Sequence, residues 1–76
     1  MADFEKGVMG EVVRVERNVF KGRDYVSARI WVPSRDDAAV MIPTPKGLTL
    51  APELAAEVAR EMLRLAEELA AAGAGR

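Results

Sequence analysis

Apolar and polar residues alternate along residues 25–32, which predicts a β-strand with two different faces. One face would carry Val26, Ala28, Ile30 and Val32. The other would carry Tyr25, Ser27, Arg29 and Trp31. Aromatic rings stack on unpaired bases and guanidinium groups bind phosphates, so the second face is a candidate surface for single-stranded nucleic acid. The alternative is that Trp31 fills a core or a dimer interface.

The same pattern predicts three further strands. Residues 12–19 would form the first, with Val13, Val15 and Val19 pointing inward and Arg14 pointing outward, and residues 21–24 a hairpin connection to the second. Residues 38–42 and 48–50 would form the third and fourth strands. Prolines 43 and 45 cannot donate ladder hydrogen bonds, so residues 43–45 must be a loop or a sheet edge. Residues 1–11 are expected to be a flexible tail.

A long amphipathic helix should follow, beginning at Pro52, a residue suited to the first helical position. Its apolar stripe consists of Leu54, Val58, Met62, Leu65 and Leu69. We expect this stripe to cover the inner face of the sheet, and residues 71–76 to form a flexible tail after the helix. The predicted fold is α+β, with a four-stranded antiparallel sheet and one C-terminal helix in a single domain of residues 12–70.

The length of the chain restricts how it can be stabilised. It has 76 residues and no cysteine, so a small core must suffice without disulfides, and self-association into a homodimer is expected. No apolar run approaches the roughly 20 residues of a membrane span, and we expect no signal peptide. The expected location is therefore the cytoplasm, in association with the nucleoid, in a prokaryote, or the nucleus or an organelle in a eukaryote.

Charge is distributed unevenly along the chain. The net charge is −1, but residues 14–35 contain six basic and two acidic side chains, a net charge of +4. Residues 53–76 contain five acidic and three basic side chains, a net charge of −2. A basic sheet beside an acidic helix is compatible with phosphate binding on the sheet.

Residues that commonly carry catalysis are absent from the composition. The chain has no histidine and no cysteine, which removes the commonest general base and the usual zinc ligands. Asp36 and Asp37 are adjacent in a predicted turn, where such acids are usually solvated. We therefore expect no cofactor, no metal site and no enzymatic activity.

The order of elements and four short motifs resemble the single-stranded-DNA-binding domain of the transcriptional positive cofactor 4 family. The motifs are Phe-Lys-Gly at residues 20–22, Ala-Arg-Ile-Trp at 28–31, Lys-Gly-Leu-Thr-Leu at 46–50 and Pro-Glu at 52–53. The resemblance covers about residues 12–65. It implies a dimer whose two curved sheets form adjoining channels for single strands.

The resemblance also assigns residues to the binding surface. Phe20 corresponds to a stacking phenylalanine, and Lys21, Arg23, Arg29 and Lys46 to basic residues of the family. With the outward residues of the alternating strands, the candidate site is Arg14, Phe20, Lys21, Arg23, Tyr25, Arg29, Trp31 and Lys46. The family's main stacking tryptophan would align at Val32, one position after Trp31.

Two other classes of function remain open at this stage. A dimeric β-ribbon could read double-stranded DNA in the major groove, in which case the aromatic residues would be structural. Alternatively, the acidic helix could bind components of the transcription machinery as a coactivator module. The preferred partner is single-stranded DNA or RNA, and no membrane partner is expected.

Overall fold

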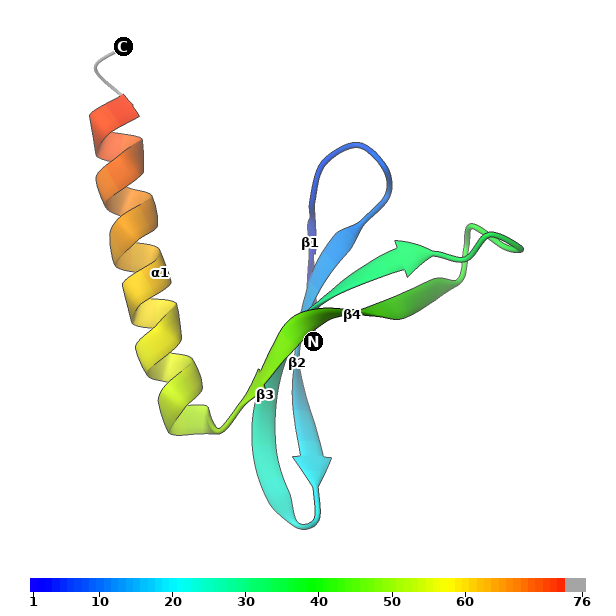
Figure 1. Ribbon diagram of the computed structural model, residues 1–76, viewed down its shortest axis with the longest axis horizontal. Coiled ribbons are helices and arrows are strands. Elements are labelled where there is room, and N and C mark those ends of the chain that lie inside the picture. The colour runs from blue at the N-terminus through cyan, green and yellow to red at the C-terminus, as the bar shows by residue number, and fades with distance from the viewer. Residues whose placement is uncertain (74–76) are drawn as a thin grey trace.

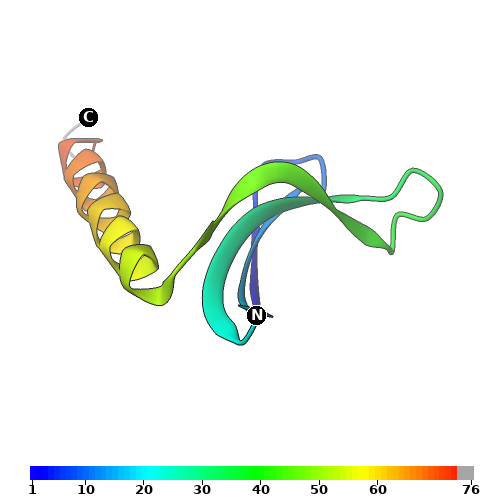
Figure 2. The ribbon, with the colours of Figure 1, turned by 60° about the horizontal axis from the view of Figure 1, so that its bottom comes forward.

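The computed structural model describes residues 1–73, which form a four-stranded antiparallel sheet followed by one helix (Figure 1). The strands lie in chain order across the sheet, and their bounds are β1 Ala2–Glu5, β2 Val12–Phe20, β3 Arg23–Pro33 and β4 Met41–Leu50; helix α1 spans Pro52–Gly73. Strands β3 and β4 bend into an arch (Figure 2). The predicted α+β class, with four antiparallel strands and a C-terminal helix, is confirmed.

The N-terminal segment corrects one sequence prediction. Residues 1–11 were expected to be a flexible tail, but β1 pairs with β2, with Asp3 opposite Arg14 and Phe4 opposite Val13. The pattern of β1 is only four residues long, too short to stand out by periodicity. It forms because the edge of β2 offers unpaired backbone groups.

The C-terminal half of the sheet corrects a second sequence prediction. Residues 38–42 and 48–50 were expected to be separate strands, but Met41–Leu50 is one continuous strand. The residues just before it form a turn, in which the Val40 amide donates to the Asp37 carbonyl at 2.9 Å and the Ala39 amide donates to the Asp37 carboxylate at 3.0 Å. Because β4 is the edge strand, it tolerates Pro43 and Pro45. The expectation that these prolines lie at a loop or a sheet edge is therefore confirmed for the edge.

A tight turn joins β2 to β3. Lys21 and Gly22 both have positive φ angles, of 50° and 76°. Two positive φ angles in a two-residue loop are the signature of a type I′ turn, whose twist matches that of the flanking strands. The connection is thus shorter than the predicted residues 21–24, and Arg23 lies in β3 directly opposite Phe20.

The helix does not close a core within one chain. Across residues 1–73 no apolar side chain is buried, and α1 extends away from the sheet (Figure 1). An apolar groove of about 270 Å³ lies between them, lined by Val13, Val15, Val26, Ala28, Leu48, Leu50, Ala55, Val58, Ala59 and Met62. Val13 and Val15 were predicted to point inward, and Val26 and Ala28 to share one face of their strand; the groove confirms both predictions. The expectation that the helix stripe covers the inner face is wrong for the single chain.

The end of the helix differs slightly from the prediction. Residues 71–76 were expected to be a tail, but α1 continues through Gly73. Residues 74–76, the remainder of that expected tail, lie outside the described residues.

Candidate nucleic-acid interface

The face of the sheet opposite the groove, here called the outer face, gathers most of the predicted site. Residues directly opposite each other on paired strands point to the same side. Arg14 lies opposite Arg29, and Phe20 lies opposite Arg23. Tyr25 and Trp31 are two-residue steps from Arg23 and Arg29 along β3, so they share this side. Alternation in the sequence therefore predicted the outer face correctly.

The two remaining candidates lie at the ends of strands or in an irregular segment. Lys21 occupies the hairpin turn, and its Nζ lies 5.4 Å from the centre of the Phe20 ring. Lys46 is in a bulge of β4, where residues 44–46 lie opposite the single residue Ile30. Both lysine side chains are exposed. The structure thus places both lysines on strands or turns that border the outer face.

At the β1 end of the outer face, Arg14 forms a cluster with Asp3 and Trp31. Arg14 Nε donates to Asp3 Oδ1 at 2.8 Å, and Nη2 donates to Oδ2 at 3.0 Å. The guanidinium carbon lies 4.2 Å from the centre of the Trp31 ring, in a cation–π contact. The Arg14 side chain is only 16% exposed as a result. The hydrogen bonds from Arg14 lower the pKa of Asp3, and the same bonds raise the pKa of Arg14.

Trp31 is consequently less open than the sequence suggested. Its side chain is half-buried, and its Nε1 atom is buried without a hydrogen-bond partner in the structure. Arg14 already lies against the indole ring. Phe20, by contrast, is 63% exposed, and Tyr25 is half-buried. The most accessible ring on the outer face is therefore Phe20, at the hairpin end.

Arg29 is held by the backbone and not by an acid. Its Nη1 donates to the Thr44 carbonyl at 3.0 Å, while Thr44 Oγ1 donates to the Ile30 carbonyl at 2.9 Å. The close approach of β4 to β3 at this point requires Gly47, because a Cβ there would lie 2.8 Å from the Ala28 carbonyl oxygen. Within residues 1–73 Arg29 has no carboxylate partner, so its charge remains available to an anion.

Between the two ends of the outer face lies a hydrogen-bonded pair of uncharged side chains. Asn18 Nδ2 donates to Ser27 Oγ at 2.7 Å, and Ser27 is only 4% exposed. Sequence reasoning placed Ser27 on this face but gave it no role, and it missed Asp3 and Thr44. Alternation of Asp3 and Glu5 with Phe4 was the available signal for Asp3.

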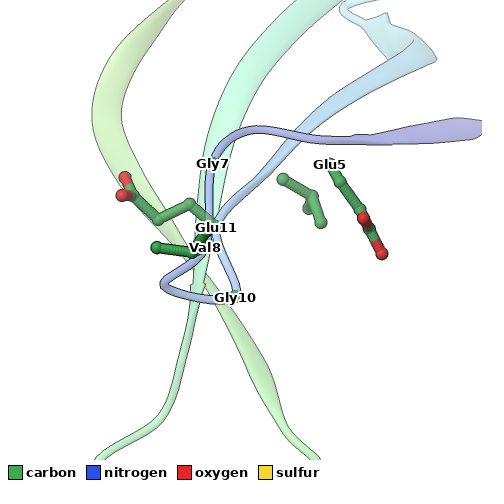
Figure 3. A pocket seen from close by; sticks show the side chains of 6 residues that line it. Glu5, Gly7, Val8, Gly10 and Glu11 are labelled. Atoms are coloured by element: carbon green, nitrogen blue, oxygen red, sulfur yellow. The ribbon is translucent and has the colours of Figure 1, made fainter.

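A second hollow lies beside the loop that joins β1 to β2. It has a volume of about 440 Å³ and is lined by Glu5, Gly7, Val8, Gly10, Glu11 and Val12. Figure 3 shows the Glu5 and Glu11 carboxylates pointing in different directions, so they do not form a paired acidic site. Among residues 1–73 no three metal-ligating side chains come together. The same residues include no helix with the length and apolar character to cross a membrane.

Comparison with known proteins gives one family. Residues 8–60 match the family model described as transcriptional coactivator p15 (PC4). Two crystal forms of BPSL1147, a PC4 homolog from Burkholderia pseudomallei K96243, are similar at 32% sequence identity. The tetragonal form gives a TM-score of 0.75 and covers 87% of this chain and 93% of that chain. The orthorhombic form gives a TM-score of 0.76 and covers 90% of this chain and 88% of that chain.

A bacteriophage T5 protein has the same fold. It is described as a homolog of the eukaryotic coactivator PC4 implicated in recombination-dependent DNA replication, and it is 21% identical, with a TM-score of 0.66 over 88% of this chain and 77% of that chain. A comparison with curated protein sequences finds no match.

Proposed function

This chain belongs to the transcriptional coactivator p15 (PC4) family, and from that premise we propose that it binds single-stranded DNA through the outer face of its sheet. The family and its homologs are associated with DNA, in transcription or in recombination-dependent replication. We infer a role of the same kind here, by binding and without catalysis. The strands that carry the proposed site lie within residues 12–70.

The observation that carries this proposal is the composition of the outer face. It combines exposed aromatic surface with cations that have no acidic partner within residues 1–73, namely Lys21, Arg23, Arg29 and Lys46. Single strands expose both phosphates and base rings, so they match both features at once.

Each group has a distinct role in the proposed complex. The four unpaired cations bind phosphates, which gives affinity without base preference. Phe20 and Tyr25 stack on bases, and Trp31 joins them where its ring is accessible. Arg14 lies over the indole ring of Trp31. Stacking accepts any base, so we expect little sequence preference.

We further propose that the binding unit is a homodimer. A single chain leaves the 270 Å³ apolar groove open and buries no apolar side chain within residues 1–73. A second copy that covers the groove would remove this surface from water, which is the main stabilising contribution available to so small a chain. Sedimentation equilibrium should give about twice the monomer mass of 8.3 kDa.

Competition binding tests the proposed ligand. The protein is titrated into a fluorescently labelled oligo-dT, and unlabelled oligo-dT, oligo-rU and a DNA duplex are then added as competitors. We expect both single strands to displace the label and the duplex to do so only weakly. Displacement by duplex at lower concentration than by oligo-dT would contradict the proposal and favour a β-ribbon that reads double-stranded DNA.

A further inference from the structure

Among residues 1–73, Arg14 is the one cation on the outer face that already has an anion. Asp3, which β1 supplies, holds Arg14 through two hydrogen bonds of 2.8 and 3.0 Å. The family match begins at residue 8, so this carboxylate lies outside the matched segment. The contact therefore involves a strand that the family match does not include.

The geometry of this pair is the geometry in which arginine binds phosphate. Two parallel N–H···O bonds from one guanidinium are typical of both arginine–carboxylate and arginine–phosphate pairs. Arg14 also lies directly opposite Arg29, and like charges opposite each other across a sheet repel. An anion bound to Arg14 reduces this repulsion. In the free protein that anion is Asp3.

The strand that carries Asp3, β1, pairs with a neighbouring strand on one side only. β1 is an edge strand of four residues, and all four are exposed. Segments with few buried contacts and exposed backbone hydrogen bonds open at low free-energy cost. Moving Asp3 away from Arg14 does not disturb the pairing of β2 with β3, which carries the rest of the site.

We propose that Asp3 is a built-in competitor that occupies the phosphate position on Arg14 until a nucleic-acid phosphate replaces it. This inference rests on the proposed binding of single strands and adds a fifth phosphate contact to that site. The exchange also lets Arg14 shift from the Trp31 ring, so that the indole becomes accessible to a base. The device lowers affinity for isolated phosphates, because a ligand must displace Asp3 before it gains this contact.

Replacement of Asp3 by asparagine tests the proposal, with Asp24→Asn as the matched control. Asp24 also pairs with an arginine, Arg17, at 3.2 Å. Its register, opposite Val19, places it on the groove side of the sheet. Both substitutions remove one negative charge from an arginine–aspartate pair, so their difference isolates the position of Asp3.

The first readout is the affinity for oligo-dT as a function of salt. We expect Asp3→Asn to bind up to about fivefold more tightly than Asp24→Asn, the factor that release of one such ion pair allows. The slope of log K against log salt should steepen by up to about 0.7, as for one added phosphate contact on a single strand. Equal affinity and slope in the two variants would overturn the proposal. Weaker binding by Asp3→Asn would also overturn it, and would show that Asp3 positions Arg14 for binding.

The second readout needs no ligand. Trp31 is the only tryptophan, so its fluorescence in the free protein reports the Arg14 contact. We expect the spectrum to shift in Asp3→Asn and to stay unchanged in Asp24→Asn, and Asp3→Ser should repeat the result if the first variant folds poorly. An unchanged spectrum in both Asp3 variants would contradict the proposal. Failure of all proteins, wild type included, to bind oligo-dT would instead reject the proposed function itself.

Discussion

The two faces of this sheet differ in whether their side chains find partners within a single chain. On the outer face, some polar side chains find partners within the chain, as in the pairs of Arg14 with Asp3 and Asn18 with Ser27. On the inner face, the valines and leucines line a groove that remains open. The outer face is therefore preorganised in a single chain, whereas the inner face needs a further apolar surface. We infer that the outer face serves binding and the inner face serves assembly.

The largest effect should come from placing a charge on the inner face. Leu50 lines the groove, and its neighbour Thr49 is exposed on the outer face, opposite Ser27. Leu50→Asp puts an unpaired carboxylate into the proposed dimer interface, at a cost of several kcal/mol. We expect loss of the dimer by sedimentation equilibrium and loss of cooperative thermal unfolding.

Thr49→Asp is the control for this substitution. It should remain dimeric and folded, and it should weaken oligo-dT binding because it adds a negative charge to the outer face. A dimeric and stable Leu50→Asp variant would show that the groove is not the assembly surface.

A second comparison uses two adjacent residues of β2. Phe20 lies on the outer face and Val19 on the inner face, and they are 63% and 65% exposed. Loss of one stacked base costs about 1–3 kcal/mol, so Phe20→Ala should weaken oligo-dT binding about 5- to 150-fold. Val19→Ala should leave the affinity nearly unchanged. Equal losses of oligo-dT affinity in both variants, at unchanged melting temperature, would contradict the inference that the outer face alone binds the single strand.

The third comparison concerns arginines on opposite faces. Arg29 lies on the outer face without a carboxylate partner within residues 1–73, and Arg17 lies on the groove side, paired with Asp24. Arg29→Gln should flatten the salt dependence of oligo-dT binding by up to about 0.7. Arg17→Gln should leave the slope unchanged. A slope that responds only to Arg17 would place the phosphates on the groove side.

The smallest expected effect is a change with pH at the β1 end. The pKa of Asp3 is lowered in the folded protein by the hydrogen bonds from Arg14. A lowered pKa means that this pair stabilises the fold above the ordinary aspartate pKa of about 3.9, and that the stabilisation is lost as pH falls through the lower folded value. Trp31 fluorescence in the free protein should therefore change below about pH 4. The change should be absent in Asp3→Asn; its persistence there would assign it to another group.

The sequence predicted the face of each residue better than the extent of each strand. Alternation from Tyr25 to Val32 has period two, so it fixes sidedness wherever the strand begins. Pro43 and Pro45 led to the wrong prediction that β4 is two separate strands. The effect of a proline on a strand depends on whether that strand is at the edge of the sheet. That property belongs to the sheet as a whole and not to the local sequence.

Contacts between distant residues were the part that the sequence did not reveal. The pairing of Asp3 with Arg14 depends on the register of β1 against β2, which four residues are too few to specify. The helix stripe correctly indicated an apolar face, but periodicity cannot tell whether that face packs within one chain or against another. Both failures concern pairing over long range, and periodicity reports only the orientation of side chains along one element.

Side-chain NMR spectra recorded during a titration with oligo-dT test the central claim most directly, because they report both faces at once. The account predicts shifts in the ring signals of Phe20 and Tyr25 and in the indole N–H of Trp31. The methyl signals of the groove residues Val26 and Leu50 should stay in place. Movement of these methyl signals while the ring signals remain unchanged would contradict the assignment of binding to the outer face.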